Sequence, residues 1–167
     1  MSDIVLCDTD IMSALAKADE LEILELVFSN TNFQITEYVR DELDRSKQEG
    51  FAFPVKIFEF CGITTLNEDE LKIYESTESL TISKTDMKNL IIARNRDITL
   101  LTNDSKLYRK AVRKGIKVYD LRLILKAIYL GGMVSKSEFE RDRWKNRGKD
   151  ISKRRKIYSK MISSEVC

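Results

Sequence analysis

Short apolar runs alternate along this chain with segments whose apolar residues recur every three or four positions. Residues 4–7 form a continuous apolar run, which is typical of a central strand covered on both faces. After it, Met12, Leu15 and Ala16 recur at helical spacing, and a break at Asp19-Glu20 predicts two successive helices. The same alternation continues to residue 130. The expected strands lie at residues 4–7, 33–36, 63–66, 98–102 and 117–119.

Capping and breaking residues set the limits of the expected helices. Thr36 is placed to cap the helix that carries Glu42, and Gly115 is placed to end a helix that starts at Asn103 or Asp104. Further helices are expected at residues 55–60, 68–75 and 120–130, from residue 85, and from the capping-box pair Ser135 and Glu138 onward. Because strands alternate with helices, the sequence predicts an α/β protein with a central, mostly parallel sheet between helical layers.

Length and composition indicate one globular domain with an appendage. The 167 residues are 43% hydrophobic and 34% charged, which suits an ordinary soluble protein with one core. The longest apolar stretches are too short to cross a bilayer, and the first residues lack the features of a secretory signal. We therefore expect a cytoplasmic protein without membrane contact. Its compact domain is expected at residues 1–134, and residues 135–167 are expected to form a basic helical extension with a frayed end.

The available residue types narrow the chemistry. The chain has no histidine, which excludes a Ser-His-Asp triad and acid–base catalysis by histidine. The three cysteines, Cys7, Cys61 and Cys167, are widely spaced and lack the partners of a zinc site, so we expect reduced thiols. Hydrolysis by this protein would therefore depend on carboxylates and a metal ion.

Basic charge is concentrated toward the C-terminus. The net charge is +2, yet residues 141–160 hold ten basic and two acidic residues. Such a segment can gather a polyanion, and Trp144 can stack on a base, whereas the plainer interpretation is a solvated helix. The candidate nucleic-acid-binding residues are Arg141, Arg143, Trp144, Lys145, Arg147, Lys153, Arg154, Arg155 and Lys156.

Four acidic residues lie at positions where a carboxylate is unfavourable for folding but could bind a metal. Asp8 and Asp104 each follow a strand-like apolar run, so in a parallel sheet they share the edge at which ligands collect. Glu42 and Asp86 lie on expected helices at the border of the buried face. Converging carboxylates repel one another, and a hard cation such as Mg²⁺ or Mn²⁺, which prefers oxygen ligands, removes that conflict.

Each of these acids also has a structural interpretation. Asp8 can end a strand, Asp86 can complete a capping box with Ser83, and Asp104 can favour the positive end of a helix. Glu42 can be a solvated helix residue. Singly, each acid is better explained by folding, whereas the order and context of all four favour a site.

This order of motifs resembles that of the PIN domain, a compact three-layer α/β/α nuclease fold. The resemblance covers roughly residues 3–131 and rests on motif order, because no single motif is decisive. The segments that carry it are IVLCDTDIM at residues 4–12, ITEYVRDEL at 35–43, TDMKNLIIA at 85–93 and LLTND at 100–104.

The resemblance implies a metal-dependent ribonuclease, as in the VapC toxins of prokaryotic toxin–antitoxin pairs. It implies RNA as substrate, Mg²⁺ or Mn²⁺ as cofactor, a homodimer, and an antitoxin protein as partner where the chain is a toxin. The implied catalytic and metal-site residues are Asp8, Glu42, Asp86 and Asp104, and the neighbours implied to orient a ligand or water are Asp10, Thr102 and Asn103.

Two other functions compete with the nuclease. Asp8-Thr9-Asp10 after an apolar strand also resembles the first motif of haloacid-dehalogenase-like phosphatases, with Asp8 as nucleophile and Asp10 as general acid. That interpretation lacks the later paired aspartates of the family and leaves Glu42 and Asp86 without a role. The other alternative is a PIN-like module that binds RNA or a protein without cutting.

Overall fold

A parallel sheet forms the centre of the protein. The computed structural model describes residues 3–77 and 82–131, and within them the strand order is β3-β2-β1-β4-β5 with every neighbouring pair parallel. The predicted parallel sheet is confirmed. The strands are β1 (Asp3–Cys7), β2 (Thr31–Thr36), β3 (Gly62–Thr64), β4 (Thr99–Leu101) and β5 (Val118–Tyr119).

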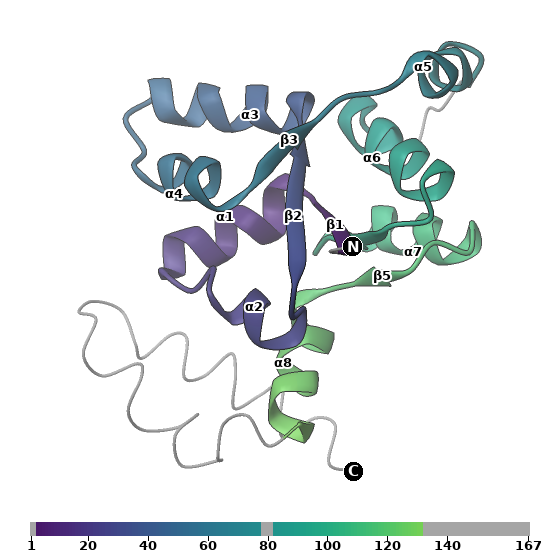
Figure 1. Ribbon diagram of the computed structural model, residues 1–167. Helices are drawn as coiled ribbons and strands as arrows, with labels where there is room; N and C mark the ends of the chain where they lie inside the picture. Colours follow the sequence, from purple (N-terminus) through teal and green to yellow (C-terminus); the bar gives the residue numbers. More distant parts are fainter. Residues whose placement is uncertain (1–2, 78–81, 132–167) are drawn as a thin grey trace. The chain divides into compact units, whose positions relative to one another are not determined.

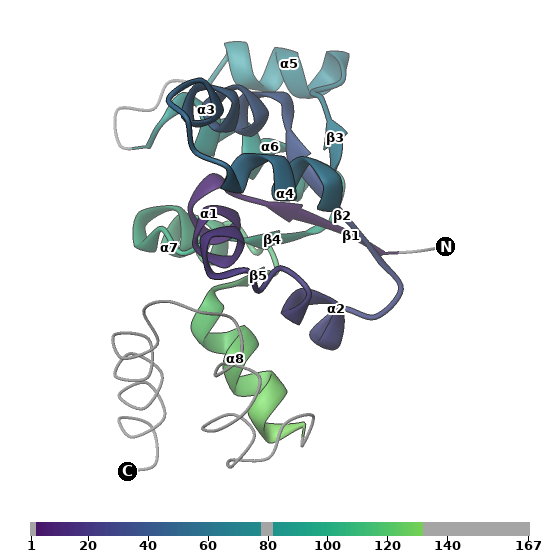
Figure 2. The same ribbon diagram turned by 90° about the vertical axis from the view of Figure 1, so that its left-hand side faces the viewer.

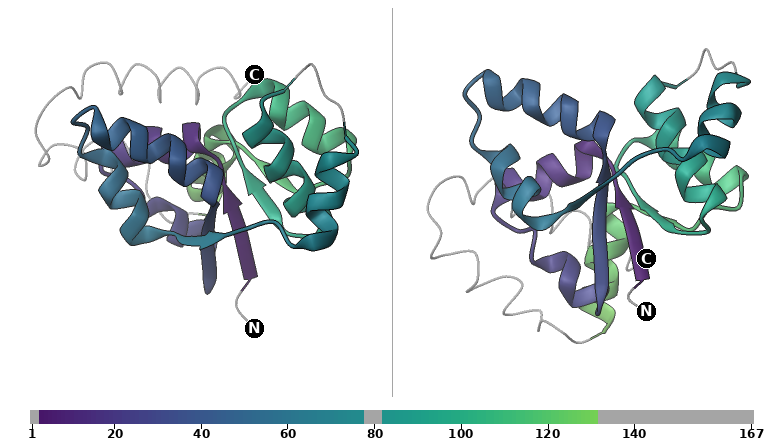
Figure 3. Two further views of the ribbon diagram at one scale, coloured as in Figure 1. Left: turned by 90° about the horizontal axis from the view of Figure 1, so that it is seen from above. Right: turned by 45° about the horizontal axis from the view of Figure 1, so that its top comes forward.

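Helices cover both faces of this sheet, as expected. On one side α1, α3 and α4 pack together, and on the other α6 contacts both α5 and α7 (Figure 1; Figure 3, left). The helices are α1 (Thr9–Ala18), α2 (Ile23–Val27), α3 (Glu37–Gln48), α4 (Phe53–Phe60), α5 (Glu68–Glu75), α6 (Lys84–Asn95), α7 (Ser105–Arg113) and α8 (Leu121–Leu130). None of the helices among the described residues is long and apolar enough to span a bilayer.

The chain divides into two compact units, Met1–Leu121 and Arg122–Cys167. The sheet, helices α1 to α7 and every predicted carboxylate of the site belong to the first unit. The helix expected from Ser135 and the candidate nucleic-acid-binding residues between Arg141 and Lys156 lie outside the described residues.

Local side chains explain where the helices begin and end. The Thr36 hydroxyl accepts a hydrogen bond from the Val39 N–H at 3.3 Å and caps α3, as predicted. The break between the first two helices falls at Asp19, whose φ of 60° ends α1 in the left-handed conformation. Gly115, with a φ of +73°, follows the last turn of α7. The strand expected at residues 63–66 is shorter and ends at Thr64.

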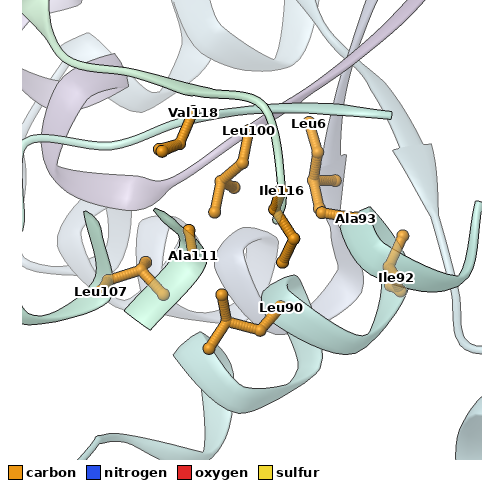
Figure 4. Packing of buried hydrophobic residues seen from close by; sticks show 9 residues of the cluster. All are labelled: Leu6, Leu90, Ile92, Ala93, Leu100, Leu107, Ala111, Ile116 and Val118. Atoms are coloured by element: carbon orange, nitrogen blue, oxygen red, sulfur yellow. The ribbon is translucent and has the colours of Figure 1, made fainter. Parts of the chain in front are cut away.

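Alternate residues of β1 face opposite helical layers, as a central parallel strand requires. Leu6 is fully buried and packs with residues from α6, α7, β4 and β5 (Figure 4). These contacts fix both ends of the segment between β4 and α7, from which the polar residues at the edge of the sheet project. The buried cluster comprises Leu6, Leu90, Ile92, Ala93, Leu100, Leu107, Ala111, Ile116 and Val118.

A buried ion pair joins α5 to the end of α6. Glu70 is fully buried, and its two carboxylate oxygens accept hydrogen bonds from Arg96 at 2.8 and 2.7 Å. Asn95 and the N–H of Asn67 also donate to this carboxylate. Burial raises the pKa of Glu70, but the hydrogen bonds from Arg96, Asn67 and Asn95 together outweigh burial and place this pKa below its ordinary value.

Glu70→Gln should lower the free energy of unfolding by about 2–3 kcal/mol, because Arg96 would lose its charge partner in a mostly buried position. Since the folded pKa lies below the unfolded one, the stabilisation by Glu70 is present above pH 4.5 and is lost as the pH falls through the folded pKa. Urea unfolding at neutral and acidic pH measures both effects. Glu68→Gln, on the exposed side of the same helix, is the control, and an equal loss in the two variants would contradict the prediction.

Candidate functional site

The strand order places β1 at the point where the connections reverse direction. From β1 the chain adds β2 and β3 on one side, then returns to add β4 and β5 on the other. In parallel sheets ligands bind outside the carboxyl ends of the strands at this reversal. Asp8 follows β1, Thr102 follows β4, and the Asp8 N–H donates to the Leu101 carbonyl at 3.0 Å. In Figure 2, β1 runs from the N label toward α1 and α7, which marks this end of the sheet.

Asp8 is buried at this edge, with 5% of its surface exposed. One carboxylate oxygen accepts a hydrogen bond from Asn89 Nδ2 at 3.2 Å, and the other accepts one from Thr102 Oγ1 at 2.9 Å. The donors come from α6 and from the end of β4. Asp8 is therefore held from both sides of β1, which fixes the orientation of its carboxylate.

The two donors to Asp8 are themselves oriented by further hydrogen bonds. Asn89 Oδ1 accepts from the Thr36 hydroxyl at 3.2 Å, and this bond fixes which end of the amide faces Asp8. The Thr102 hydroxyl accepts from the Asp104 N–H at 3.1 Å, so its own proton is directed to Asp8. Each oxygen of Asp8 therefore accepts a hydrogen bond from a donor that is itself held in one orientation.

Glu42 lies between the first turns of two other helices. The Thr9 hydroxyl at the start of α1 donates to Oε2 at 2.6 Å, and the Thr85 hydroxyl at the start of α6 donates to Oε1 at 2.7 Å. Glu42 is partly buried rather than freely solvated. It thus connects the helices on the two sides of the sheet at the edge where Asp8 lies.

Asp86 and Asp104 both take part in helix caps, as their structural interpretations predicted. Asp86 and Ser83 form a capping box at the start of α6, with the Asp86 N–H donating to Ser83 Oγ at 3.0 Å. The side chain of Asp104 caps α7 and accepts from the N–H groups of Lys106 and Leu107 at 2.8 and 2.7 Å. Capping positions both carboxylates without burying them fully.

Asp10 and Asn103 complete the polar edge. One carboxylate oxygen of Asp10 accepts from the Ile11 N–H at 2.6 Å and from the Asn103 N–H at 3.2 Å. The Asn103 side chain in turn accepts from the Leu121 N–H at 2.9 Å. Both side chains therefore hold the backbone that surrounds the carboxylates.

The acids lie close enough to change one another's protonation. The pKa of Asp8 is raised from 3.8 to about 8, because burial and the charges of Asp10 and Asp86 together outweigh the hydrogen bond from Thr102, which lowers it. Burial also raises the pKa of Asp86, and the nearby charges of Asp104 and Glu42 act in the same direction against the Ser83 hydrogen bonds. These mutual effects show that the carboxylates share one electrostatic neighbourhood.

The donor set suits a hard divalent cation, because it consists of carboxylate oxygens that repel one another. Within residues 3–77 and 82–131, however, no three acidic or cysteine side chains already surround a single point. The oxygens of Glu42, Asp86 and Asp104 are directed toward hydroxyl and backbone donors instead. Binding of a cation would therefore exchange some of these hydrogen bonds for metal contacts.

Sequence reasoning missed the side chains that hold the acids. Asn89 was part of a recognised motif but received no role, although a buried polar residue within an apolar helical run is an informative signal. Thr9 and Thr85 each adjoin a predicted site acid, and both donate to a third acid, Glu42. These two contacts join residues that lie 33 and 43 positions apart in the chain, so they could not be inferred from spacing alone.

A protein-family model described as DUF3368, PIN domain, matches residues 4–163. Among solved structures, the fold is similar to VapBC2 from Rickettsia felis bound to a DNA fragment from their promoter, with a TM-score of 0.57 and 18% identity over 70% of this chain and 98% of that chain. It is also similar to VapBC-1 from nontypeable Haemophilus influenzae, with a TM-score of 0.54 and 17% identity over 70% of this chain and 97% of that chain.

A third similar structure is a PilT N-terminus domain protein from the archaeon Sulfolobus solfataricus P2. Its TM-score is 0.53 at 10% identity, and the match covers 74% of this chain and 92% of that chain. No curated protein matches the chain. At identities of 10–18%, the structural likenesses show a shared fold.

Proposed function

The chain belongs to the PIN domain family, and from this premise we propose that it is a metal-dependent endoribonuclease. The observation that carries the proposal is the gathering of Asp8, Glu42, Asp86 and Asp104 at the carboxyl edge of the sheet, where each affects or adjoins another. Together with the chain's lack of histidine, this set favours hydrolysis through carboxylates and a cation.

The four acids are proposed to hold Mg²⁺ or Mn²⁺. When bound, such an ion supplies an activated water and stabilises negative charge on the phosphate and on the leaving oxygen. The protein's own part is to keep the carboxylates in place: Asn89 and Thr102 orient Asp8, and the N-terminal turn of α7 orients Asp104. Because these carboxylates are already held in place, they need not change position when the reaction takes place.

The family and the site favour a nuclease over the phosphatase. In the phosphatase interpretation Asp10 would be the general acid, yet its carboxylate accepts hydrogen bonds from two backbone N–H groups. Glu42 would have no role, although two threonine hydroxyls hold it at the site. We further propose, by likeness to the VapBC structures, that an antitoxin protein is a partner and that the chain acts as a homodimeric toxin.

The direct test is cleavage of a mixed pool of labelled single-stranded and structured RNAs with Mg²⁺, with Mn²⁺ and with EDTA. We expect cutting that requires the metal and releases fragments with defined ends. Turnover of a phosphomonoester without RNA cutting would favour the phosphatase. RNA binding with no cutting under any condition would favour the binding module.

Asn89→Leu should lower the rate of RNA cleavage about 10–100-fold, the usual cost of losing a group that orients a metal ligand. The variant removes one donor to Asp8 and the acceptor of the Thr36 hydroxyl. Single-turnover rates across a Mg²⁺ titration measure the effect. Asn95→Leu, which also loses a hydrogen bond from α6 but away from the site, is the control. Equal rates in the two variants would contradict a positioning role.

A further inference from the structure

Helix α7 and the turn after it carry a separate concentration of positive charge. Residues 105–117 hold six basic residues and no acidic one, whereas residues 1–104 hold ten basic and 21 acidic residues. The sequence prediction assigned nucleic-acid contact to residues 141–156 and gave α7 no such role. Most of the first unit therefore repels a polyanion, and this segment attracts one.

The fold presents these cations on the outer side of α7. Leu107 and Ala111 are buried in the hydrophobic cluster. Lys106, Arg109 and Arg113, spaced by three and four residues, lie on the exposed side of the same helix. Lys114 and Lys117, in the turn that follows, are exposed as well. We call these five exposed residues the α7 basic face.

Acids of the described chain leave most of this face uncompensated. Four ion pairs of the described residues use cations outside this face, namely Arg40, Lys56, Lys72 and Arg96. Lys106, Arg113, Lys114 and Lys117 take part in none of them. A solvated helix face ordinarily mixes both signs of charge, so this segregation points to an anionic partner.

The α7 basic face begins at the carboxyl edge of the sheet, where the proposed metal-site acids lie. Asp104, a proposed metal-site residue, is the residue whose side chain caps α7, and Lys106 follows it by two positions. Lys106 and Arg113 are seven residues apart, which corresponds to about 10 Å along a helix. The positive end of the helix dipole and the first cations of the face thus lie beside the carboxylates, where a phosphodiester would have to approach.

We propose that the α7 basic face binds the phosphate backbone of RNA and leads it to the acidic site. The proposal rests on the proposed nuclease function and adds to it the path of the substrate. A backbone-binding face favours RNA of any sequence, because contacts to phosphates position a strand without reading its bases. Free phosphodiester chains suit it better than an acidic peptide, since the face continues from the site where phosphate is cut.

The test compares two double variants of the full chain. Arg113→Gln/Lys117→Gln removes two charges from the face at its end remote from the carboxylates, and Arg45→Gln/Lys47→Gln removes two exposed charges from α3. Fluorescence anisotropy of a labelled single-stranded RNA in EDTA measures binding without cleavage, across a series of salt concentrations. Cleavage kinetics with Mg²⁺ then separate KM from kcat.

We expect the α7 variant alone to bind RNA several-fold more weakly. The slope of log binding constant against log salt concentration should become less steep by about 1.4, since each phosphate contact on a single strand contributes about 0.7. Its KM should rise while kcat stays unchanged. Equal weakening in both variants, or in neither, overturns the proposal. Loss of duplex DNA binding with RNA binding intact also overturns it and assigns the face to DNA.

Failure of the nuclease and failure of the RNA path give different results. If the α7 variant selectively loses RNA binding but the wild-type protein cuts no RNA, the path stands and the catalytic function falls. If the wild-type protein cuts RNA and the α7 variant has an unchanged KM, the nuclease stands and the path falls.

Discussion

Asp8→Asn is expected to reduce metal-dependent RNA cleavage at least about 100-fold, because Asp8 is a proposed metal ligand and losing even an orienting partner of such a ligand typically costs 10–100-fold. The buried carboxylate receives hydrogen bonds from Asn89 and Thr102, and both donors are fixed by their own partners. An asparagine would present an NH₂ group to one of these donors and would carry no charge for a cation. Single-turnover cleavage with Mn²⁺ measures the loss.

The control is Asp3→Asn, which removes a carboxylate from the exposed start of the same strand. Its cleavage rate should equal that of the wild type. Thermal unfolding of both variants shows whether the fold is retained. If folded Asp8→Asn protein kept more than about a tenth of the wild-type rate, a deficit worth less than about 1.4 kcal/mol of transition-state stabilisation, Asp8 would not be an essential metal ligand.

Much of the fold could be predicted from the sequence because local signals agree with the tertiary structure. The apolar run at residues 4–7 became the central strand β1, and Glu68–Glu75 formed a helix with the expected bounds. The sequence predicted the bounds of the strand at the sheet edge less well, because β3 ends at Thr64 rather than at residue 66. An edge strand pairs on one side only, so its length depends on its partner β2 more than on its own residues.

The positions of Asp8 and Asp104 in the site could be predicted because residues after parallel strands share one edge of the sheet. The placement of Glu42 depends on helix packing instead. Thr9 and Thr85 reach it from helices on opposite sides of the sheet, and no periodic pattern reports such an encounter. The geometry of a carboxylate cluster therefore comes from tertiary packing, even where its members are visible in the sequence.

The net charge of the chain does not reveal the α7 basic face. Taken without residues 141–160, the chain is acidic overall, and that average includes the six cations of residues 105–117. Only the helix register separates the buried Leu107 and Ala111 from the cations on the other side. The basic residues were therefore visible in the sequence, but the proposed RNA path could be inferred only once the structure placed α7 directly after Asp104.

Divalent cations are expected to stabilise the protein more at about pH 8 than at about pH 6. Burial and the charge of Asp10 raise the pKa of Asp8 from 3.8 to about 8 in the metal-free protein. The folded state thus holds a proton on Asp8 that the unfolded state releases, so the contribution of Asp8 to stability is greatest below pH 3.8 and falls as the pH rises toward 8. Each pKa unit corresponds to about 1.4 kcal/mol, which makes the cost of ionising Asp8 several kcal/mol.

A bound cation would compensate that charge and restore the stability where the loss is greatest. Scanning fluorimetry with Mg²⁺ and with EDTA at the two pH values should show a larger metal-induced rise in Tm at the higher pH. Asp8→Asn should lose the pH dependence of this rise, whereas Asp3→Asn should keep it. The stabilisation by Glu70 is lost only below pH 4.5, so it does not change between the two pH values of this measurement. A metal-induced shift that is equal at both pH values would mean that the cation binds without contacting Asp8.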